Sequence, residues 1–490
     1  MNTRWTVVAV LLFMIIAPYS LGVASLAQPR VFPEDLQGDN IVRMAVSLNL
    51  SGDTDDETAS ALCGLKAGVE WVNSNGGVKM RGKNWTLQLV YDDNGGDPVR
   101  VEEFYRQAAK DGIKIFLAPY KVDLTVHAAQ VAVEEIAFLA VYMPYGERAV
   151  KVAPYAIQVS SPLQERMKDV MAVITEYKKT GASIIVVRED SNYGKEAAKI
   201  IKNLAVQLGH NIIDEIVYEP GTLTQRLDSI PGRDTVDALV IIISDLTSME
   251  KAVSEAYNSK LGFNIVILDE PGSMPTLYVK LGSAVAENLV ALSDWEPTGY
   301  YNFEQAKNVL VRWYGPELDE IKALWAKHCP AIDPNSVMAS ATASVLIIAD
   351  LLSQAGSDNP KTLFEKAKTY NGMTFYGNFA INPDGTQRAH IPLVVQWQDG
   401  AKQIILPKHL ALTGPVFPAD NWLNKISKAE TGGAQATGGQ QVGGETAGQQ
   451  QQAQATGGQE AQQGGGIPIA AVAALIVVLA AAGLVLMRRK

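Results

Sequence analysis

The chain has 490 residues and a formal net charge of −10 at neutral pH. This charge argues against nucleic acid or an anionic membrane surface as a partner, because both require basic patches. The two cysteines, Cys63 and Cys329, are too few for a disulfide framework. They can form a single bridge, but the sequence does not show whether they lie close together.

The N-terminus has the pattern of a removed signal peptide, which we assign to residues 1–27. Arg4 provides a positive charge, residues 7–16 form an apolar run, and residues 25–27 (Ser-Leu-Ala) form a small-residue cleavage pattern. An uncleaved membrane anchor is the alternative. A removed signal peptide implies that the protein is exported.

The C-terminal residues predict a stalk followed by a membrane anchor. Residues 430–466 are rich in Gly, Gln, Ala and Thr and cannot bury enough apolar surface to fold, so we expect a disordered stalk. Residues 467–487 carry no charge and are long enough to cross about 30 Å of hydrocarbon as a transmembrane helix. The basic residues 488–490 then form a cytoplasmic tail, which places the rest of the chain outside the cell. A buried helix of the folded part is the alternative.

Between residues 40 and 410, short apolar runs alternate with amphipathic helical patterns. The apolar runs are β-branched and nearly continuous, as in parallel strands covered on both faces: 41–46, 87–91, 113–118, 138–142, 183–187, 238–243 and 265–268. The helical patterns lie at 58–73, 99–111, 163–179 and 194–208. This order predicts a doubly wound α/β fold. One large barrel is the alternative, but a helix-rich stretch and a final run of strands interrupt the alternation.

The interruption favours two doubly wound parallel-sheet lobes joined by a hinge of three crossovers. We assign the first lobe to residues 40–158 and 293–376, and the second lobe to residues 159–292 and 377–408. The crossovers are expected near residues 158–161, 292–295 and 376–378. In open parallel sheets, ligands bind outside the carboxyl ends of the strands. The cleft between the lobes is therefore the predicted binding site.

The loops that follow the strands provide the candidate residues. The first loop, 48–57, contains Ser51 and a run of acids, which either cap a helix or attract a cation. Their spacing is not that of a calcium loop. Lys121 and Val122 begin a predicted helix whose free N–H groups can hold a carboxylate. The other side chains at strand ends are Tyr142, Met143, Tyr193, Asp245, Asp269 and Glu270.

No loop contains a motif for phosphate binding, dinucleotide binding or hydrolysis. A Walker-type loop, GxGxxG, GxSxG and HExxH are all absent. None of the five histidines lies in a strand-end loop, and no two have the spacing of metal ligands. We therefore expect no enzymatic activity, no cofactor and no metal site.

Five segments carry a combined pattern: 41–52 (IVRMAVSLNLSG), 64–78 with its Asn-Gly-Gly turn, 91–98, 190–194 (DSNYG) and 375–385. Together they resemble the branched-chain amino-acid (Leu/Ile/Val-type) substrate-binding proteins of ABC transporters, within the type I periplasmic-binding-protein superfamily. The resemblance covers about residues 40–408 and implies the two-lobed fold.

The resemblance also implies roles for individual residues. Tyr193 matches the tyrosine that packs on the bound amino acid in that family. Glu270 matches the acid that pairs with the ammonium of the ligand, and Asp269 lies next to it. Lys121 and Val122 stand where the family has paired serines that hold the α-carboxylate.

These departures leave two interpretations of the pocket open. In one, Lys121 replaces the serine hydroxyl with a direct charge pair to a carboxylate. In the other, Asp245, Asp269, Glu270 and the acids at 53–57 form a net negative cleft that prefers cationic or amine-rich ligands. Both follow from the rule that a buried ligand charge needs a partner.

The resemblance implies a solute receptor, and the predicted C-terminal helix would tether it to the cytoplasmic membrane with the binding domain at the cell surface. Its lobes would close over an amino acid, amide or related small solute and deliver it to an ABC permease and its ATPase. The alternative is a ligand-sensing ectodomain of the same fold that signals through a partner membrane protein.

Overall fold

The computed structural model describes residues 29–36, 38–51, 56–231, 235–299 and 301–423. These residues belong to one compact unit. The predicted signal peptide (1–27), stalk (430–466), transmembrane helix (467–487) and tail (488–490) lie outside the described residues. Residues 53–55 of the first acidic loop also lie outside them.

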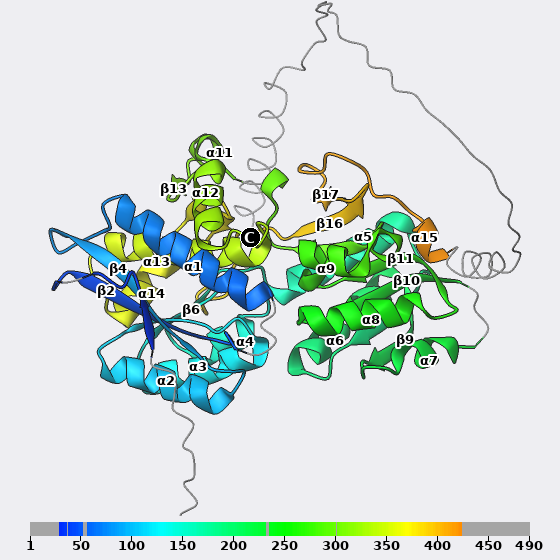
Figure 1. The fold of residues 1–490 in the computed structure, drawn as a ribbon. Coiled ribbons are helices and arrows are strands. Elements are labelled where there is room, and N and C mark those ends of the chain that lie inside the picture. The colour runs from blue at the N-terminus through cyan, green and yellow to red at the C-terminus, as the bar shows by residue number, and fades with distance from the viewer. Residues whose placement is uncertain (1–28, 37, 52–55, 232–234, 300, 424–490) are drawn as a thin grey trace, which may run out of the picture. The chain divides into compact units, whose positions relative to one another are not determined.

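The first sheet has a parallel centre and an antiparallel edge (Figure 1). Its order is β1 (Arg30–Phe32), β4 (Lys83–Asp93), β2 (Ile41–Leu48), β5 (Ile115–Leu117), β6 (Phe138–Val141) and β7 (Ala156–Gln158), with β3 (Val78–Met80) beside β4. Only β1 and β3 are antiparallel to their neighbour among these described strands. The connecting helices are α1 (Asp56–Ser74), α2 (Pro98–Lys110), α3 (Val122–Glu134) and α4 (Glu147–Val152).

The second sheet has the same plan. Its order is β9 (Asn211–Val217), β8 (Ser183–Arg188), β10 (Thr235–Ile242), β11 (Gly262–Leu268), β12 (Val290–Ser293), β16 (Leu393–Gln398) and β17 (Ala401–Leu406). The neighbouring strands β9, β8, β10, β11 and β12 are parallel to one another. Strand β16 is antiparallel to β12, and β17 is antiparallel to β16. Its helices are α5 (Leu163–Tyr177), α6 (Asn192–Leu208), α7 (Leu223–Asp228), α8 (Leu246–Tyr257), the 3-10 helix η1 (Glu270–Ser273), α9 (Pro275–Leu281), α10 (Ser283–Ala286) and α15 (Asp420–Leu423).

Residues 297–379 return the chain to the first sheet after β12. This stretch contains η2 (Pro297–Gly299), α11 (Phe303–Asn308), β13 (Arg312–Trp313), α12 (Leu318–His328), α13 (Ser336–Ala355), α14 (Pro360–Thr369), β14 (Gly372–Thr374) and β15 (Gly377–Phe379). The strands β13, β14 and β15 form a small third sheet. We call the first sheet with α1–α4 and α12–α14 the first lobe, and the second sheet with α5–α10, η1 and α15 the second lobe.

Helix α13 is the main packing partner of α1 within the first lobe (Figure 1). A Cβ atom at Gly64 of α1 would lie 2.3 Å from the carbonyl oxygen of Met338, so the two helices approach as closely as a glycine allows. In length and composition α13 could cross a membrane, but 94% of its most apolar 18-residue window is buried in the protein. Its apolar character is therefore accounted for by packing in the core.

A disulfide joins Cys63 of α1 to Cys329 at the end of α12, with 6.0 Å between the two Cα atoms. The two cysteines therefore lie close together, which the sequence alone did not show. The bridge fastens the returning segment to the first helix of the same lobe, across a sequence separation of 266 residues.

The two sheets are mixed, with antiparallel strands at the edges of the predicted parallel centres. Each sheet keeps a parallel centre, but a strand that returns through a short turn can pair only in the antiparallel direction. This applies to β16 and β17, which a two-residue turn connects, and to β3 and β4. The edge strand β9 was not predicted from the sequence, because Asn211, Asp214 and Glu215 interrupt its apolar residues.

Candidate functional site

A small cavity lies where strand-end loops of the two lobes meet. Its volume is 30 Å³, room for about one water molecule. The first lobe contributes Glu57, Tyr120, Lys121, Val122, Met143 and Pro144, and the second lobe contributes Tyr193, Ser244, Asp269, Glu270 and Pro271. A solute the size of an amino acid can therefore enter only if the lobes separate.

The first-lobe wall combines a cation with the start of a helix. Lys121 is the residue before α3, and its side chain makes no capping hydrogen bond to that helix. Its Nζ lies 3.6 Å from Oε2 of Glu57, an almost completely buried residue of α1. The first N–H groups of a helix have no partner within the helix, so this wall can hold a carboxylate at the start of α3.

The second-lobe wall contains an aromatic ring and two acids. The hydroxyl of Tyr193, near the start of α6, donates to Asp269, which follows β11. Burial and the neighbouring Asp269 carboxylate raise the pKa of Tyr193 well above its usual value, so the hydroxyl keeps its proton. Asp269 also accepts a hydrogen bond from the backbone N–H of Glu270, at 2.8 Å, and so caps η1.

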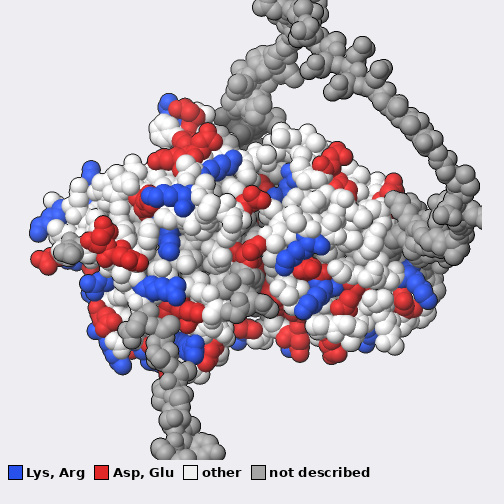
Figure 2. Space-filling model, viewed as in Figure 1, with Lys and Arg blue, Asp and Glu red and all other residues white. Residues whose placement is uncertain are grey.

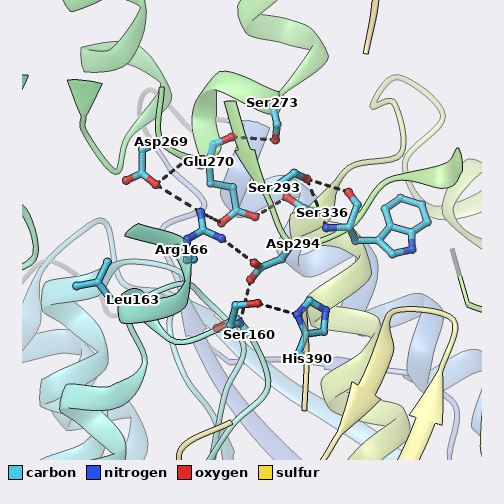
Figure 3. Close-up of polar contacts among 12 residues, drawn as sticks. Ser160, Leu163, Arg166, Asp269, Glu270, Ser273, Ser293, Asp294, Ser336 and His390 are labelled. Carbon is cyan, nitrogen blue, oxygen red and sulfur yellow. Dashed lines mark hydrogen bonds and ion pairs between the residues drawn. The ribbon is translucent and has the colours of Figure 1, made fainter. Parts of the chain in front are cut away.

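Arg166 lies behind this wall and has no solvent exposure. Figure 3 shows its guanidinium between three carboxylates. Nη1 donates to Oδ1 of Asp294 at 2.7 Å, while Nη2 lies 3.4 Å from Asp269 and 3.5 Å from Glu270. Burial acts to raise the pKa of Asp294, but the Arg166 charge holds that pKa below its usual value.

Glu270 links the cavity to both lobes. The hydroxyl of Ser336, at the start of α13 in the first lobe, donates to its Oε1 at 2.5 Å. Its Oε2 accepts no hydrogen bond from any residue that the structure describes. Burial raises the pKa of Glu270 to about 7, although the Arg166 charge opposes this rise. A second contact between the lobes joins the Thr276 hydroxyl of α9 to Asp56 of α1.

Six of the nine residues predicted from the sequence line the cavity: Lys121, Val122, Met143, Tyr193, Asp269 and Glu270. The other three do not. Asp245 caps α8 by accepting from the Ser248 N–H at 2.8 Å. Tyr142 is buried behind the wall, with its ring centroid 5.9 Å from that of Tyr120, and Ser51 is exposed in its loop.

These positions change the charge expected of the site. Asp245 is a helix cap and Arg166 offsets part of the charge of Asp269 and Glu270, so the wall is less negative than the sequence suggested. Sequence reasoning missed Arg166. The signal was present, because Arg166 falls on the apolar stripe of α5 with Leu163, Met167 and Val170. A charge on such a stripe needs a buried partner.

A larger groove of 960 Å³ lies beside the cavity. The Tyr145 ring, which lines the groove, packs 5.2 Å from the Tyr193 ring, which lines the cavity. The basic groove residues Arg148, Lys151 and Arg388 are exposed to solvent. Exposed charges interact weakly with a solute, so the buried cavity is the stronger candidate site.

Among the described residues, no group of three or more His, Cys, Asp or Glu side chains is arranged to hold a metal ion. On the face in Figure 2, acidic and basic side chains are interspersed over the surface.

Comparison with known proteins identifies relatives of the whole two-lobed region. A model of a family described as periplasmic binding protein matches residues 41–402. The structure is similar to the branched-chain amino acid transporter substrate-binding protein LivJ of Streptococcus pneumoniae in complex with isoleucine, with 16% identity, a TM-score of 0.60, and coverage of 74% of this chain and 99% of that one.

Two further solved structures show the same likeness. The leucine-binding protein LivK of Thermotoga maritima has 16% identity, a TM-score of 0.59, and coverage of 74% of this chain and 97% of that one. A solute-binding protein of an ABC transporter from R. palustris, in complex with 4-hydroxybenzoate, has 15% identity, a TM-score of 0.60, and coverage of 74% and 95%. At these identities the structural likeness establishes the fold.

Proposed function

This chain belongs to the periplasmic binding protein family, and on that premise we propose that it captures a small solute for an ABC importer. The observation that carries the proposal is the cavity between the lobes. Charged and aromatic side chains from strand-end loops of both sheets converge there, with Lys121 on one wall and Tyr193 and Glu270 on the other. The proposal includes no catalytic step, and the named relatives are substrate-binding or solute-binding proteins.

The walls favour a solute with a carboxylate and a second polar group, such as an amino acid, an amide or an aromatic acid. The carboxylate would lie at the start of α3 beside Lys121, where helix N–H groups and a cation both favour negative charge. A donor on the solute, such as an ammonium, would meet Oε2 of Glu270, which accepts no hydrogen bond from the described residues. The relatives named above bind isoleucine and 4-hydroxybenzoate, which suggests the range of solutes to test.

Capture would require opening and closing of the lobes. The cavity is too small for an amino acid, and hydrogen bonds join the two lobes, among them Ser336 to Glu270 and Thr276 to Asp56. Opening would break these contacts, and a solute would replace them with its own contacts to both walls. Closure of two domains about a hinge is a common way to bury a ligand.

Delivery would take place at the cell surface. The Cys63–Cys329 disulfide supports an oxidising compartment, since such bridges are rare in the cytoplasm. The predicted signal peptide and the uncharged run at 467–487 support export and membrane anchoring. The stalk at 430–466 would keep the receptor near its permease and ATPase, so that a weak docking affinity suffices.

A thermal-shift screen tests the proposal. Purified protein is heated with isoleucine, leucine, glutamine, lysine, 4-hydroxybenzoate and glucose in turn. A solute that binds only the folded state, at a hundred times its Kd, adds about 2.7 kcal/mol to the free energy of unfolding. We expect a rise in Tm with one class of solute and its loss in Glu270→Gln. Equal melting curves with every solute would contradict the proposal.

A further inference from the structure

Arg166 stands between the cavity wall and the segments that connect the lobes. Its position in α5, directly after the first crossover, places a fully buried guanidinium at the junction (Figure 3). A guanidinium has separate nitrogen donors in a fixed plane, so one side chain can hold carboxylates on two sides at once. In Arg166, Nη1 faces Asp294 and Nη2 faces Asp269 and Glu270.

On the Asp294 side, all three crossovers meet at one carboxylate. Asp294 itself lies in the second crossover, directly after β12. Its Oδ2 accepts hydrogen bonds from the Ser161 N–H of the first crossover, at 3.1 Å, and from the Tyr376 hydroxyl of the third, at 3.3 Å. The Ser161 hydroxyl also lies 2.7 Å from Nδ1 of His390, whose ring stacks on Tyr376. Movement of Asp294 would therefore displace hydrogen bonds to all three crossovers between the lobes.

On the cavity side, the network is incomplete. The contacts of Nη2 with Asp269 (3.4 Å) and Glu270 (3.5 Å) are longer than the hydrogen bond from Nη1 to Asp294 (2.7 Å). Neither Nε of Arg166 nor Oε2 of Glu270 has a hydrogen-bond partner among the described residues. Buried polar atoms without partners are unfavourable, so this side rearranges more readily than the Asp294 side.

We propose that Arg166 is a positioning residue that couples the acids facing the solute, Asp269 and Glu270, to the three crossovers through Asp294. When the charge or hydrogen bonding of Glu270 changes, Nη2 shifts between Glu270 and Asp269, and Nη1 carries the shift to Asp294. The inference rests on the proposed function, because a solute donor at Glu270 would supply that change. The coupling itself exists without solute and is measurable without one.

A double-mutant cycle tests the coupling in solute-free protein. Hydrogen exchange of the peptide containing the Ser161 amide is measured for the wild type, Glu270→Gln, Asp294→Asn and the double variant, and the cycle is repeated with Arg166→Lys. Lysine keeps the charge, but its single ammonium nitrogen cannot contact both sides as the guanidinium does. Arg188→Lys is the matched control, because Arg188 is another largely buried arginine of the second lobe, paired with Glu215 at 2.5 Å.

We expect Glu270→Gln to slow exchange at Ser161 by about tenfold, because Arg166 then pairs more fully with Asp294. In the Asp294→Asn and Arg166→Lys backgrounds the same substitution should change exchange by less than about twofold. Arg188→Lys should leave the Ser161 amide unchanged. An equal effect of Glu270→Gln in the Arg166→Lys background, or no effect in the wild type, would overturn the proposal. If the cycle behaves as expected but no solute binds, only the proposed function fails.

Discussion

Replacing Arg166 with methionine should destabilise the protein in a pH-dependent way. The substitution removes the cation from a site with no solvent exposure and leaves three carboxylates, Asp269, Glu270 and Asp294, close together. Breaking a buried ion pair by removing one partner lowers the free energy of unfolding by about 3–5 kcal/mol. We expect a loss of this size at pH 7.5.

The loss should shrink in acid because a carboxyl can take up a proton in place of the lost cation. Arg166 now holds the pKa of Asp294 below its usual value, so in the wild type Asp294 favours the folded state above its unfolded pKa and loses this effect as pH falls. Without Arg166, burial raises that pKa, so the folded variant binds one more proton than the folded wild type across mildly acidic pH. Each pH unit then contributes about 1.4 kcal/mol, or about 3 kcal/mol between pH 7.5 and 5.5.

Urea denaturation followed by circular dichroism at pH 5.5, 6.5 and 7.5 measures this effect. The wild type at each pH is the reference, because the raised pKa of Glu270 makes the free energy of unfolding of the wild type decrease as pH rises. Arg188→Met serves as the matched control, since its partner Glu215 keeps Lys202 as a second cation. A loss below about 1 kcal/mol, or an equal loss at all three pH values, would refute this account of the cluster.

Further substitutions test three other parts of the structure. Replacing Cys63 and Cys329 together with serine should lower the free energy of unfolding by up to about 5 kcal/mol, given the 266-residue separation, and dithiothreitol should lower the urea midpoint of the wild type but not of this variant. Gly64→Ala should cost about 1–3 kcal/mol, because its Cβ would lie 2.3 Å from a backbone oxygen of α13, while Gly414→Ala, with no atom within 4 Å of the new Cβ, should change stability by less than about 0.5 kcal/mol. Asp245→Ala should cost about 1 kcal/mol as a lost helix cap, with solute affinity unchanged; a large loss of affinity would place Asp245 in the site after all.

Much of the fold was predictable because buried parallel strands have an unmistakable composition. Each strand predicted from a continuous apolar run is present, among them β2, β8 and β10, and the helices α1, α2, α5 and α6 begin and end within a few residues of the predicted ranges. Two edge strands were missed, because they are exposed on one side and their residues are mixed. These strands are Arg30–Phe32 and Asn211–Val217.

The sequence predicted those residues of the candidate site that lie within a few residues of strand ends, but not the others. Lys121, Tyr193 and Glu270 lie two to five residues after strand ends, so their places at the carboxyl end of a parallel sheet follow from the topology. Arg166 lies in the first turn of an amphipathic helix, and its partners lie more than 100 residues away in sequence. Asp245 shows that a strand-end position has two interpretations, because an acid there also lies at a helix start, and in this structure Asp245 caps that helix.

A crystal structure of the protein grown with the solute that gives the largest thermal shift tests the central claim most directly. The account predicts that the lobes hold the solute between Lys121 on one wall and Tyr193 and Glu270 on the other. Solute bound instead in the open groove beside Lys151 and Arg388, with the cavity as small as it is now, would contradict it.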